Sequence, residues 1–388
     1  MEFNNLITYK TGLVAKTLRG LEHILASEIR DLGGKNIKTG TRAVFFDGDR
    51  ELMYRTNFQS RTALKVLHPF YEFFARNENE LYREAYKIDW SILLSNNKTF
   101  AIDSVLNSPY FNHSRYIALR VKDAIADQFR AKTGKRPSVN TDDPDIRVSI
   151  HISGEKCTLL LDSSGESLHK RGYRDAASSA PLNEVLAAGI IILSGWDRKM
   201  PFIDPMCGSG TIPIEAAMMA YHIPPGIYRK SFAFEKWPDF DELLFKKIYN
   251  QEHPEPIERP LIIGSDKSYQ SVAISKQNAK NAFLGKKIEF KVSSFEEMNP
   301  PEGPGILVTN PPYGERIKQE NLKAFHSVMG DVLKKNYREY TAWILSSNLE
   351  ALKFTGLRAE KKIILFNGPL ECRFVKFSIY GGSRKGNK

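Results

Sequence analysis

Short alternating runs of hydrophobic and polar residues fill the first 165 residues of the chain, with longer stretches of helical spacing between them. The alternating runs predict strands at residues 13–17, 43–47, 99–105, 148–152 and 157–162. Apolar residues three and four apart predict helices at residues 21–32 and 115–131, and a further helix that begins at residue 51. We therefore expect two successive α+β domains, at residues 1–62 and 63–165.

Beyond residue 166 the pattern changes, because apolar strands and amphipathic helices now follow one another. The predicted strands are residues 201–203, 261–264, 288–292, 305–308, 342–345, 362–366 and 374–379. The predicted helices are residues 180–194, 211–220 and 269–283, the first of them opened by Pro181. This order favours the Rossmann-like α/β class, a mostly parallel sheet covered on both faces. We expect this domain at residues 166–380, and a disordered basic tail at residues 381–388.

The composition is that of an ordinary globular protein. Of the 388 residues, 41% are hydrophobic and 26% are charged, and no apolar run reaches the length of about eighteen residues that a membrane span needs. Residues 1–10 lack the basic-then-apolar order of a secretory signal. Cys157, Cys207 and Cys372 are too widely separated for a disulfide framework or a zinc site. These features predict a cytoplasmic protein without a bound metal.

The chain carries an excess of positive charge. Its 56 Lys and Arg residues against 45 Asp and Glu residues give a net charge of +11, which favours a polyanionic partner. The predicted helix at 115–131 gathers basic residues, although Asp123 and Asp127 dilute them, and a solvated helical face stays an equal alternative. Residues 165–174 form a second, basic connector. The candidate nucleic-acid contacts are Arg120, Lys122, Arg130, Lys135, Arg136, Lys170, Arg171 and Arg174.

A glycine-rich turn follows the first strand of the C-terminal domain. Gly208 and Gly210 let the backbone approach a ligand closely, and the helix that begins at Thr211 offers free N–H groups. A phosphate-binding loop would need a lysine after Gly210, and a dinucleotide fingerprint would need a glycine where Pro213 stands. The carboxylate of Asp204 suits a cationic sulfonium ligand better than a pyrophosphate. Taken alone, the turn is also compatible with a plain strand–helix connection.

A second motif, Val-Thr-Asn-Pro-Pro-Tyr-Gly-Glu-Arg, occupies residues 308–316 and follows another predicted strand. Together with the glycine turn, it resembles the S-adenosylmethionine-dependent amino-methyltransferases. The resemblance implies that the catalytic residues are Asn310, Pro311, Pro312 and Tyr313. It also implies S-adenosylmethionine as the cofactor, held by Asp204, Pro205, Cys207, Gly208, Ser209, Gly210 and Thr211.

Three further segments complete the implied cofactor site. In the family, a stretch similar to the one that contains Pro181 and Leu182 closes over the cofactor. An acidic residue at the end of the second strand, here Asp266 after Ser265, holds ribose hydroxyls in nucleotide-binding α/β sheets. Ser294 and Phe295 follow the third strand, where many relatives carry an aspartate that accepts from the adenine amino group. Ser294 departs from that family pattern.

The Asn-Pro-Pro-Tyr motif suits an unreactive amine. The exocyclic amine of guanine or adenine is a weak nucleophile, because its lone pair is conjugated with the ring. The side-chain oxygen of Asn310 and the carbonyl of Pro311 can accept its two N–H groups, which turns the lone pair toward the methyl donor. Tyr313 can stack on the base, which must leave its own stack to reach such a pocket.

The N-terminal half carries a second resemblance. Residues 100–105, 121–127, 134–139 and 145–150 resemble a THUMP domain, an RNA-binding module that a ferredoxin-like domain usually precedes. The insert Phe-Ala-Phe-Glu-Lys-Trp at residues 232–237 resembles the bacterial 23S ribosomal RNA guanine-N2 methyltransferases in particular. The resemblance covers nearly the whole chain. It implies RNA as the partner, and one methyl transfer to the N2 amine of a guanosine in 23S rRNA.

Other functions stay open at this point. A tRNA guanine-N2 methyltransferase would have the same two modules. A DNA adenine-N6 methyltransferase shares Asn-Pro-Pro-Tyr, but the THUMP-like half argues against it. A non-catalytic RNA-binding assembly factor would need a vestigial cofactor motif, and the motif is intact.

Overall fold

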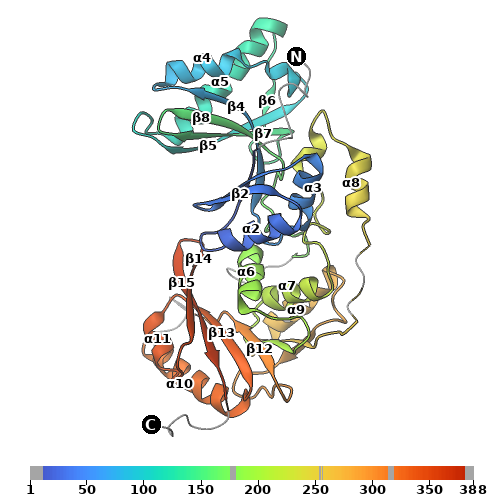
Figure 1. The fold of residues 1–388 in the computed structure, drawn as a ribbon, viewed down its shortest axis with the longest axis vertical. Coiled ribbons are helices and arrows are strands. Elements are labelled where there is room, and N and C mark those ends of the chain that lie inside the picture. The colour runs from blue at the N-terminus through green and yellow to red at the C-terminus, as the bar shows by residue number, and fades with distance from the viewer. Residues whose placement is uncertain (1–11, 175–180, 253–254, 256, 313–318, 381–388) are drawn as a thin grey trace. The chain divides into compact units, whose positions relative to one another are not determined.

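The computed structural model describes residues 12–174, 181–252, 255, 257–312 and 319–380. They form two compact units (Figure 1). Unit 1 combines the chain up to Thr17 with Leu25–Leu168 and Arg229–Gln251, and unit 2 combines Leu18–Ile24, His169–Tyr228 and the chain from Glu252 onward. The units are therefore not contiguous in sequence, unlike the domains that the hydrophobic pattern predicts. The predicted tail at 381–388 lies outside the described residues.

Unit 1 is built on one eight-stranded sheet with the strand order β2-β3-β1-β4-β8-β7-β5-β6. In that order the strands are Lys35–Gly40, Ala43–Asp47, Leu13–Lys16, Lys65–Phe74, Lys156–Asp162, Ile146–Ser153, Thr99–Asn107 and Ser138–Val139. The strands predicted near residues 13, 43, 99, 148 and 157 are confirmed.

Strand β4 joins the two predicted α+β domains into a single sheet. It pairs with β1 on one side, where Leu67 lies opposite Val14, and with β8 on the other. The two expected α+β domains therefore share one sheet. The sequence pattern misses β4 because Pro69 interrupts its alternation, and a bulge next to Pro69 accommodates the proline. It misses β2 because the sequence Lys-Asn-Ile-Lys-Thr-Gly is polar on both faces.

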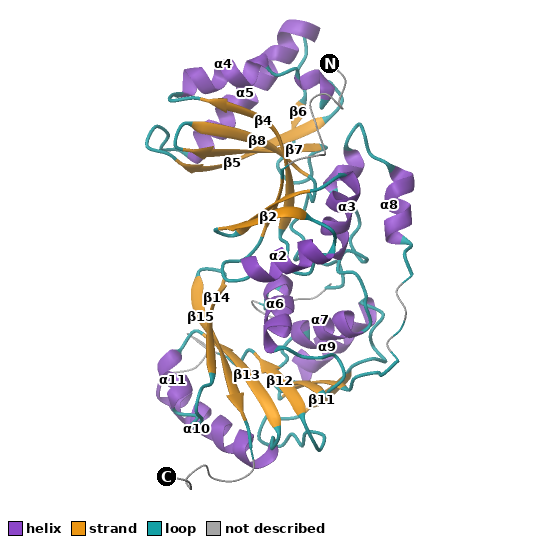
Figure 2. Ribbon diagram, viewed as in Figure 1, coloured by secondary structure: helices purple, strands orange, loops and turns teal. Residues whose placement is uncertain are grey.

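The helices of the N-terminal half are α2 (Glu22–Asp31), α3 (Arg50–Gln59), α4 (Glu78–Lys87) and α5 (Ser114–Thr133). Figure 2 shows α4 and α5 over one face of the strands β4, β8, β7 and β5. The prediction of α5 is confirmed, and the helix ends at Gly134, whose φ of 71° is left-handed. Its predicted apolar stripe is buried and consists of Ile117, Val121, Ala124, Ile125 and Phe129.

The insert at residues 229–251 folds with unit 1, although it lies within the C-terminal half of the sequence. It contains a short 3₁₀ helix, η2 (Ala233–Lys236), and α8 (Glu242–Tyr249), which lies beside α3 in Figure 1. The ring of Phe234 stacks on Tyr54 of α3, with 4.3 Å between centroids, and meets Phe245 of α8 edge-on. An ion pair of 2.7 Å joins Arg50 to Asp239. These contacts bury the aromatic residues that the sequence places in the insert.

Unit 2 contains a seven-stranded sheet with the order β11-β10-β9-β12-β13-β15-β14. In that order the strands are Glu289–Val292, Ile262–Asp266, Phe202–Asp204, Gly305–Thr309, Tyr340–Ser346, Leu370–Ser378 and Lys361–Asn367. The first five are parallel, and β15 and β14 form an antiparallel hairpin at one edge. The predicted Rossmann-like class is confirmed.

The helices of the C-terminal half are α6 (Glu184–Ser194), α7 (Thr211–Ala220), α9 (Tyr269–Asn281), α10 (Gln319–Asn336) and α11 (Leu349–Lys353). Figure 2 shows α10 and α11 on one face of the sheet and α6, α7 and α9 on the other. Asn183 caps α6 through its side chain, so Pro181 precedes the helix instead of opening it. None of the helices in the described ranges is both long and apolar enough to cross a lipid bilayer.

We predict that Phe234→Ala loosens the insert and α3 together. Removing a fully buried phenylalanine ring costs about 3–5 kcal/mol, and this ring contacts α3 directly. Native-state hydrogen exchange should then show weaker protection of the α3 amides. Leu243→Ala on α8 is the control, because Leu243 is 81% exposed and its loss should change stability by less than about 0.5 kcal/mol. Unchanged α3 protection in Phe234→Ala would show that the insert does not support unit 1.

Candidate active site

The two predicted motifs meet at the carboxyl edge of the sheet of unit 2. Strands β9 and β12 are parallel neighbours, with Ile203 opposite Leu307. Parallel neighbours end at the same edge, so Asp204 and the residues after Val308 lie close together. The hydroxyl of Thr309 donates a hydrogen bond of 2.8 Å to Oδ1 of Asp204. This bond connects the glycine turn directly to the Asn-Pro-Pro segment.

Asp204 is an acid in an apolar environment. Its side chain is 1% exposed, and among the described residues no Lys, Arg or His forms an ion pair with it. Burial raises the pKa of Asp204 to about 7, and the nearby Asp266 adds to the effect. Hydrogen bonds from Thr309 and from the Met206 N–H oppose the rise. A carboxyl group held in this way is stabilised in its ionised form by a cation that enters the site.

Helix α9 holds the glycine turn in place. Gly208 and Gly210 have φ values of 54° and 81°, which favour glycine. Ser275 of α9 donates its hydroxyl hydrogen to the Gly208 carbonyl at 2.8 Å, and the amide of Asn278 donates to the Ser209 carbonyl at 3.1 Å. The sequence analysis missed both α9 residues. Their signal was available, because two polar residues three positions apart lie on one face of the predicted helix.

Two residues predicted to contact the cofactor, Ser265 and Phe295, have buried side chains with partners inside the protein. The hydroxyl of Ser265 is fully buried and bonds to the Pro205 carbonyl at 3.3 Å and to the sulfur of Met298. The ring of Phe295 is buried and stacks on Tyr337, with 5.6 Å between centroids. Both side chains are packed inward in this conformation, so their contact with the cofactor stays a prediction.

Other predicted cofactor residues lie around the turn. Asp266 is half-buried at the end of β10 and accepts a 3.0 Å hydrogen bond from the Gly208 N–H. Ser294 and Pro181 are half-buried, and Leu182 is buried. The remaining predicted residues of the turn are buried and form its inner wall: Pro205, Cys207, Ser209 and Thr211.

The Asn-Pro-Pro segment leaves an acceptor without a partner. Oδ1 of Asn310 is buried, and it accepts no hydrogen bond from any described residue. Such an atom costs free energy unless a ligand or water satisfies it. Pro311 is buried and Pro312 is half-buried. Tyr313 lies outside the described residues.

The basic connector before α6 contributes side chains to a buried network of charges, and these side chains do not lie on the surface. The side chain of Arg171 is 1% exposed, and its Nε lies 3.4 Å from Oε1 of Glu215, which is also fully buried. The Tyr173 hydroxyl donates to the same oxygen at 3.2 Å. The prediction that Arg171 contacts nucleic acid is therefore wrong for this conformation. An acid in the apolar helix α7 was the signal, since a buried carboxylate requires a buried partner.

Arg174 belongs to the same network. Its Nη2 donates to the Thr211 hydroxyl at 2.8 Å and lies 3.1 Å from Glu184. Burial raises the pKa of Glu184 to about 7, although the Arg174 charge opposes the rise. The side chain of Arg174 is 17% exposed, so it holds the first turn of α7 and is not available to a phosphate. Lys170 is exposed.

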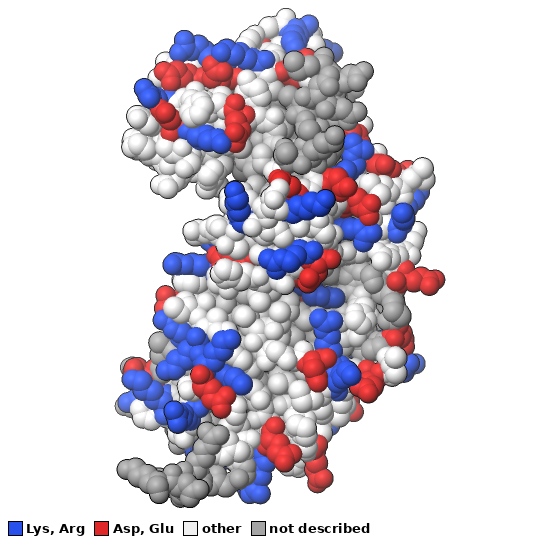
Figure 3. Space-filling model, in the orientation of Figure 1, with Lys and Arg blue, Asp and Glu red and all other residues white. Residues whose placement is uncertain are grey.

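The basic residues predicted on α5 have local partners. Arg120 lies over the ring of Tyr82 at 4.7 Å, while Lys122 pairs with Asp123 and Arg130 with Asp127. On the face of unit 1 seen in Figure 3, Lys and Arg side chains accordingly alternate with Asp and Glu. The two candidates beyond the helix, Lys135 and Arg136, are exposed and form no ion pair with a described residue. A denser basic group lies in the part of unit 2 near α11 and β15 (Figure 3).

The described parts of the chain contain no group of three or more His, Cys, Asp or Glu side chains with the arrangement of a metal site.

Three family models match the chain in succession. The RlmL ferredoxin-like domain matches residues 12–67, and the THUMP domain matches residues 75–162. The RMKL-like methyltransferase domain matches residues 171–376, more than half of the chain. Fold and motifs therefore define a THUMP-containing methyltransferase. The chain belongs to the RMKL-like methyltransferase family.

Named relatives cover the chain along most of its length. A Synechocystis protein with the provisional name RNA methyltransferase is 40% identical over 94% of this chain and 96% of its own. The ribosomal RNA large subunit methyltransferases K/L of Shewanella frigidimarina and of Shewanella sp. W3-18-1 are 35% and 37% identical over 95% of this chain. The chain spans about half the length of these two Shewanella proteins, 52% and 53%.

Two solved structures have the same fold over almost the entire chain. SMU.472, provisionally described as a methyltransferase, contains S-adenosylhomocysteine (SAH) and is 30% identical, with a TM-score of 0.85 over 97% of this chain and 99% of its own. A Listeria monocytogenes protein described as an N6-adenine-specific DNA methylase is also 30% identical, with a TM-score of 0.83 over 96% of this chain and 97% of its own.

We predict that the buried Arg171–Glu215 pair matters for stability only as a pair. Arg171→Met leaves a buried carboxylate, and Glu215→Leu leaves a buried guanidinium, so each should cost about 3–5 kcal/mol. The double variant should lose markedly less than the sum of the two, because no unpaired charge remains buried. Thermal unfolding of the four proteins completes the cycle. Strictly additive losses would show that the two side chains do not interact.

Proposed function

We propose that this chain transfers a methyl group from S-adenosylmethionine to the exocyclic N2 amine of a guanosine in RNA, with 23S ribosomal RNA as the substrate. The observation that carries the proposal is Oδ1 of Asn310, which accepts from no described residue and lies one residue after the Thr309 that bonds to Asp204. The Asn310 oxygen can accept from an amine, and the Asp204 carboxylate can pair with a cation. Both groups are thus fixed at one edge of the sheet.

The residues around the glycine turn fit the cofactor. Asp204 is a buried acid without a described cation, which matches a positively charged amino acid moiety. Gly210 packs tightly against α9, because a side chain there would approach Ser275 to 3.0 Å, and this contact helps to fix the shape of the turn. Asp266 at the end of β10 would accept from ribose hydroxyls. The 30% identical SMU.472 supports this assignment, because its structure holds SAH.

The protein's part in the reaction is to position the amine. When bound, S-adenosylmethionine supplies an electrophilic methyl group on a positively charged sulfur. Asn310 Oδ1 would accept one N–H of the guanine amine, and the Pro311 carbonyl would accept the other. This arrangement draws the nitrogen toward tetrahedral geometry and aligns its lone pair with the methyl carbon. The amine loses one proton to solvent after transfer, so no strong base is needed.

The RNA part of the proposal rests on the N-terminal half and on the relatives. A THUMP-domain match covers residues 75–162, and the two Shewanella relatives are named as ribosomal RNA large subunit methyltransferases. The Listeria name points instead to an adenine in DNA, and a tRNA guanosine is the nearest alternative substrate. Adenine carries its amine on C6 and guanine on C2, so the identity of the methylated base separates the adenine assignment from the guanosine ones, and the identity of the methylated nucleic acid separates rRNA from tRNA.

We predict that Asn310→Ala abolishes methyl transfer, while Asn310→Asp retains part of it. Alanine removes the acceptor, whereas aspartate keeps two acceptor oxygens but adds a negative charge to the base pocket. Single-turnover methylation of unmodified rRNA, with cofactor affinity measured in parallel, separates chemistry from binding. Cofactor affinity should change little in both variants. A near wild-type rate in Asn310→Ala would show that the motif is only structural.

We also predict that cofactor binding releases a proton through Asp204. The pKa of about 7 means that a substantial part of this carboxyl is protonated at neutral pH, and a bound cation favours the ionised form. Affinity should therefore fall as pH decreases below 7, by up to about tenfold per pH unit. Calorimetry at pH 6 in buffers of different ionisation enthalpy measures the proton directly.

Asp204→Asn is the matched control, because it keeps the size of the side chain but cannot ionise. Any proton exchange by the cofactor itself persists in this variant, so the difference between the two proteins reports Asp204. Equal proton release in both proteins would contradict the assignment.

A further inference from the structure

The sheet of unit 1 has a hollow on the face opposite α4 and α5. Its volume is about 690 Å³, within the range of roughly 300–1,000 Å³ that ligand pockets occupy. Side chains from six strands line it. The floor is apolar and includes the buried cluster of Val14, Leu67 and Leu160. At the rim, Phe45 of β3 is 47% exposed and Val105 of β5 is 53% exposed.

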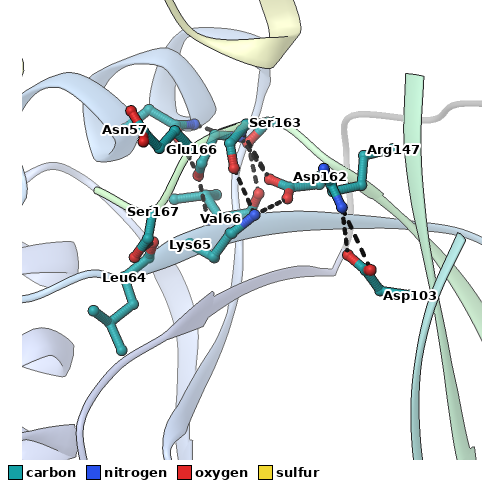
Figure 4. A network of polar contacts seen from close by, with 12 residues as sticks. Asn57, Leu64, Lys65, Val66, Asp103, Arg147, Asp162, Ser163, Glu166 and Ser167 are labelled. Atoms are coloured by element: carbon teal, nitrogen blue, oxygen red, sulfur yellow. Dashed lines mark hydrogen bonds and ion pairs between the residues drawn. The ribbon is translucent and has the colours of Figure 1, made fainter. Parts of the chain in front are cut away.

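Several charged groups on the sheet that forms the hollow are paired with one another. Glu72 of β4 pairs with Lys156 of β8 at 2.9 Å. Figure 4 shows two further pairs on the same sheet, Lys65 with Asp162 and Arg147 with Asp103. These six residues bring equal numbers of positive and negative charges, so they leave no net charge for a ligand.

Lys16 of β1 and His151 of β7 are different. Both line the hollow, and neither side chain forms an ion pair or hydrogen bond with a described residue. Burial lowers the pKa of His151, and the positive charge of Lys16 lowers it further. Burial lowers the pKa of Lys16 too, with Arg42 as the second cause. The hollow therefore holds two basic groups that repel each other across an apolar floor, and an anion would stabilise the charged form of both.

We propose that this hollow binds an unpaired RNA strand, with a phosphate facing Lys16 and His151 and a base against Phe45. The inference rests on the proposed RNA substrate, and it places a contact on a sheet face that carries none of the basic residues predicted from the sequence. Unpaired nucleotides combine an anionic group with a flat apolar surface, which is the combination that the hollow offers. Polyglutamate would supply the negative charge but has no flat ring to stack on Phe45, so it serves as the competitor that separates charge from stacking.

The test measures binding of an eight-nucleotide single strand of RNA to the full chain by fluorescence anisotropy. Lys16→Gln, His151→Gln and Phe45→Ser should each weaken binding at least fivefold. Lys247→Gln is the matched control, because Lys247 is an exposed residue of α8 outside the hollow and its loss removes the same charge. Affinity for S-adenosylmethionine should be unchanged in all four variants. Crosslinking of a 4-thiouridine-containing strand should label the peptide that contains Phe45.

The pH dependence provides a second readout. A phosphate favours protonated His151, so the wild type should bind RNA more tightly at pH 6 than at pH 8. The other charged groups that line the hollow are Lys16, Glu72 and Lys156. His151→Gln should remove most of the difference.

The proposal is overturned if the three hollow variants bind as tightly as Lys247→Gln, or if polyglutamate displaces the RNA as effectively as unlabelled RNA does. Neither outcome depends on methyl transfer. A chain that binds RNA in the hollow but forms no N2-methylguanosine would refute the proposed function alone.

Discussion

The hydrogen bond between Thr309 and Asp204 is the interaction on which the candidate site depends. A carboxyl group removed from water is costly unless it is bonded or neutral, and Asp204 has only this hydroxyl and one backbone N–H as described donors. The bond exists because β9 and β12 are parallel neighbours that end together. It fixes the acid of the glycine turn relative to Asn310, so two motifs about a hundred residues apart act at one point.

Hydrogen bonds from other parts of unit 2 hold the glycine turn and the start of α7 in place. Helix α9 holds the glycine turn through Ser275 and Asn278, and Arg174 holds the first turn of α7 through Thr211. Arg171 and Glu215 neutralise each other within the same unit. Arg171 and Arg174, which the sequence pattern places on the surface, therefore support the start of α7 and the glycine turn before it. Preorganisation of this kind is what a methyl transfer without a strong base requires.

The sequence predicts an element correctly where its hydrophobic pattern and the residues at its ends indicate the same limits. Helix α7 and strand β3 begin and end at the predicted residues, because a glycine turn and clear alternation mark their limits. Strand β4 is missed because its pairing partners, β1 and β8, come from both halves of the N-terminal region, and Pro69 hides its alternation. Arg171 and Arg174 are misplaced on the surface because an acid in an apolar helix, such as Glu215, shows that a buried cation is needed but does not show which residue supplies it. Asn310 could be proposed as a site residue from the sequence because the motif that contains it is local.

Identification of the methylated nucleoside tests the central claim most directly. The purified chain would be incubated with S-adenosylmethionine carrying a deuterated methyl group and with unmodified 23S rRNA, tRNA or duplex DNA in separate reactions. Mass spectrometry of the digested nucleosides then locates the label. We expect label only in N2-methylguanosine, and only from 23S rRNA. Label in N6-methyladenosine, or in DNA, would contradict the account.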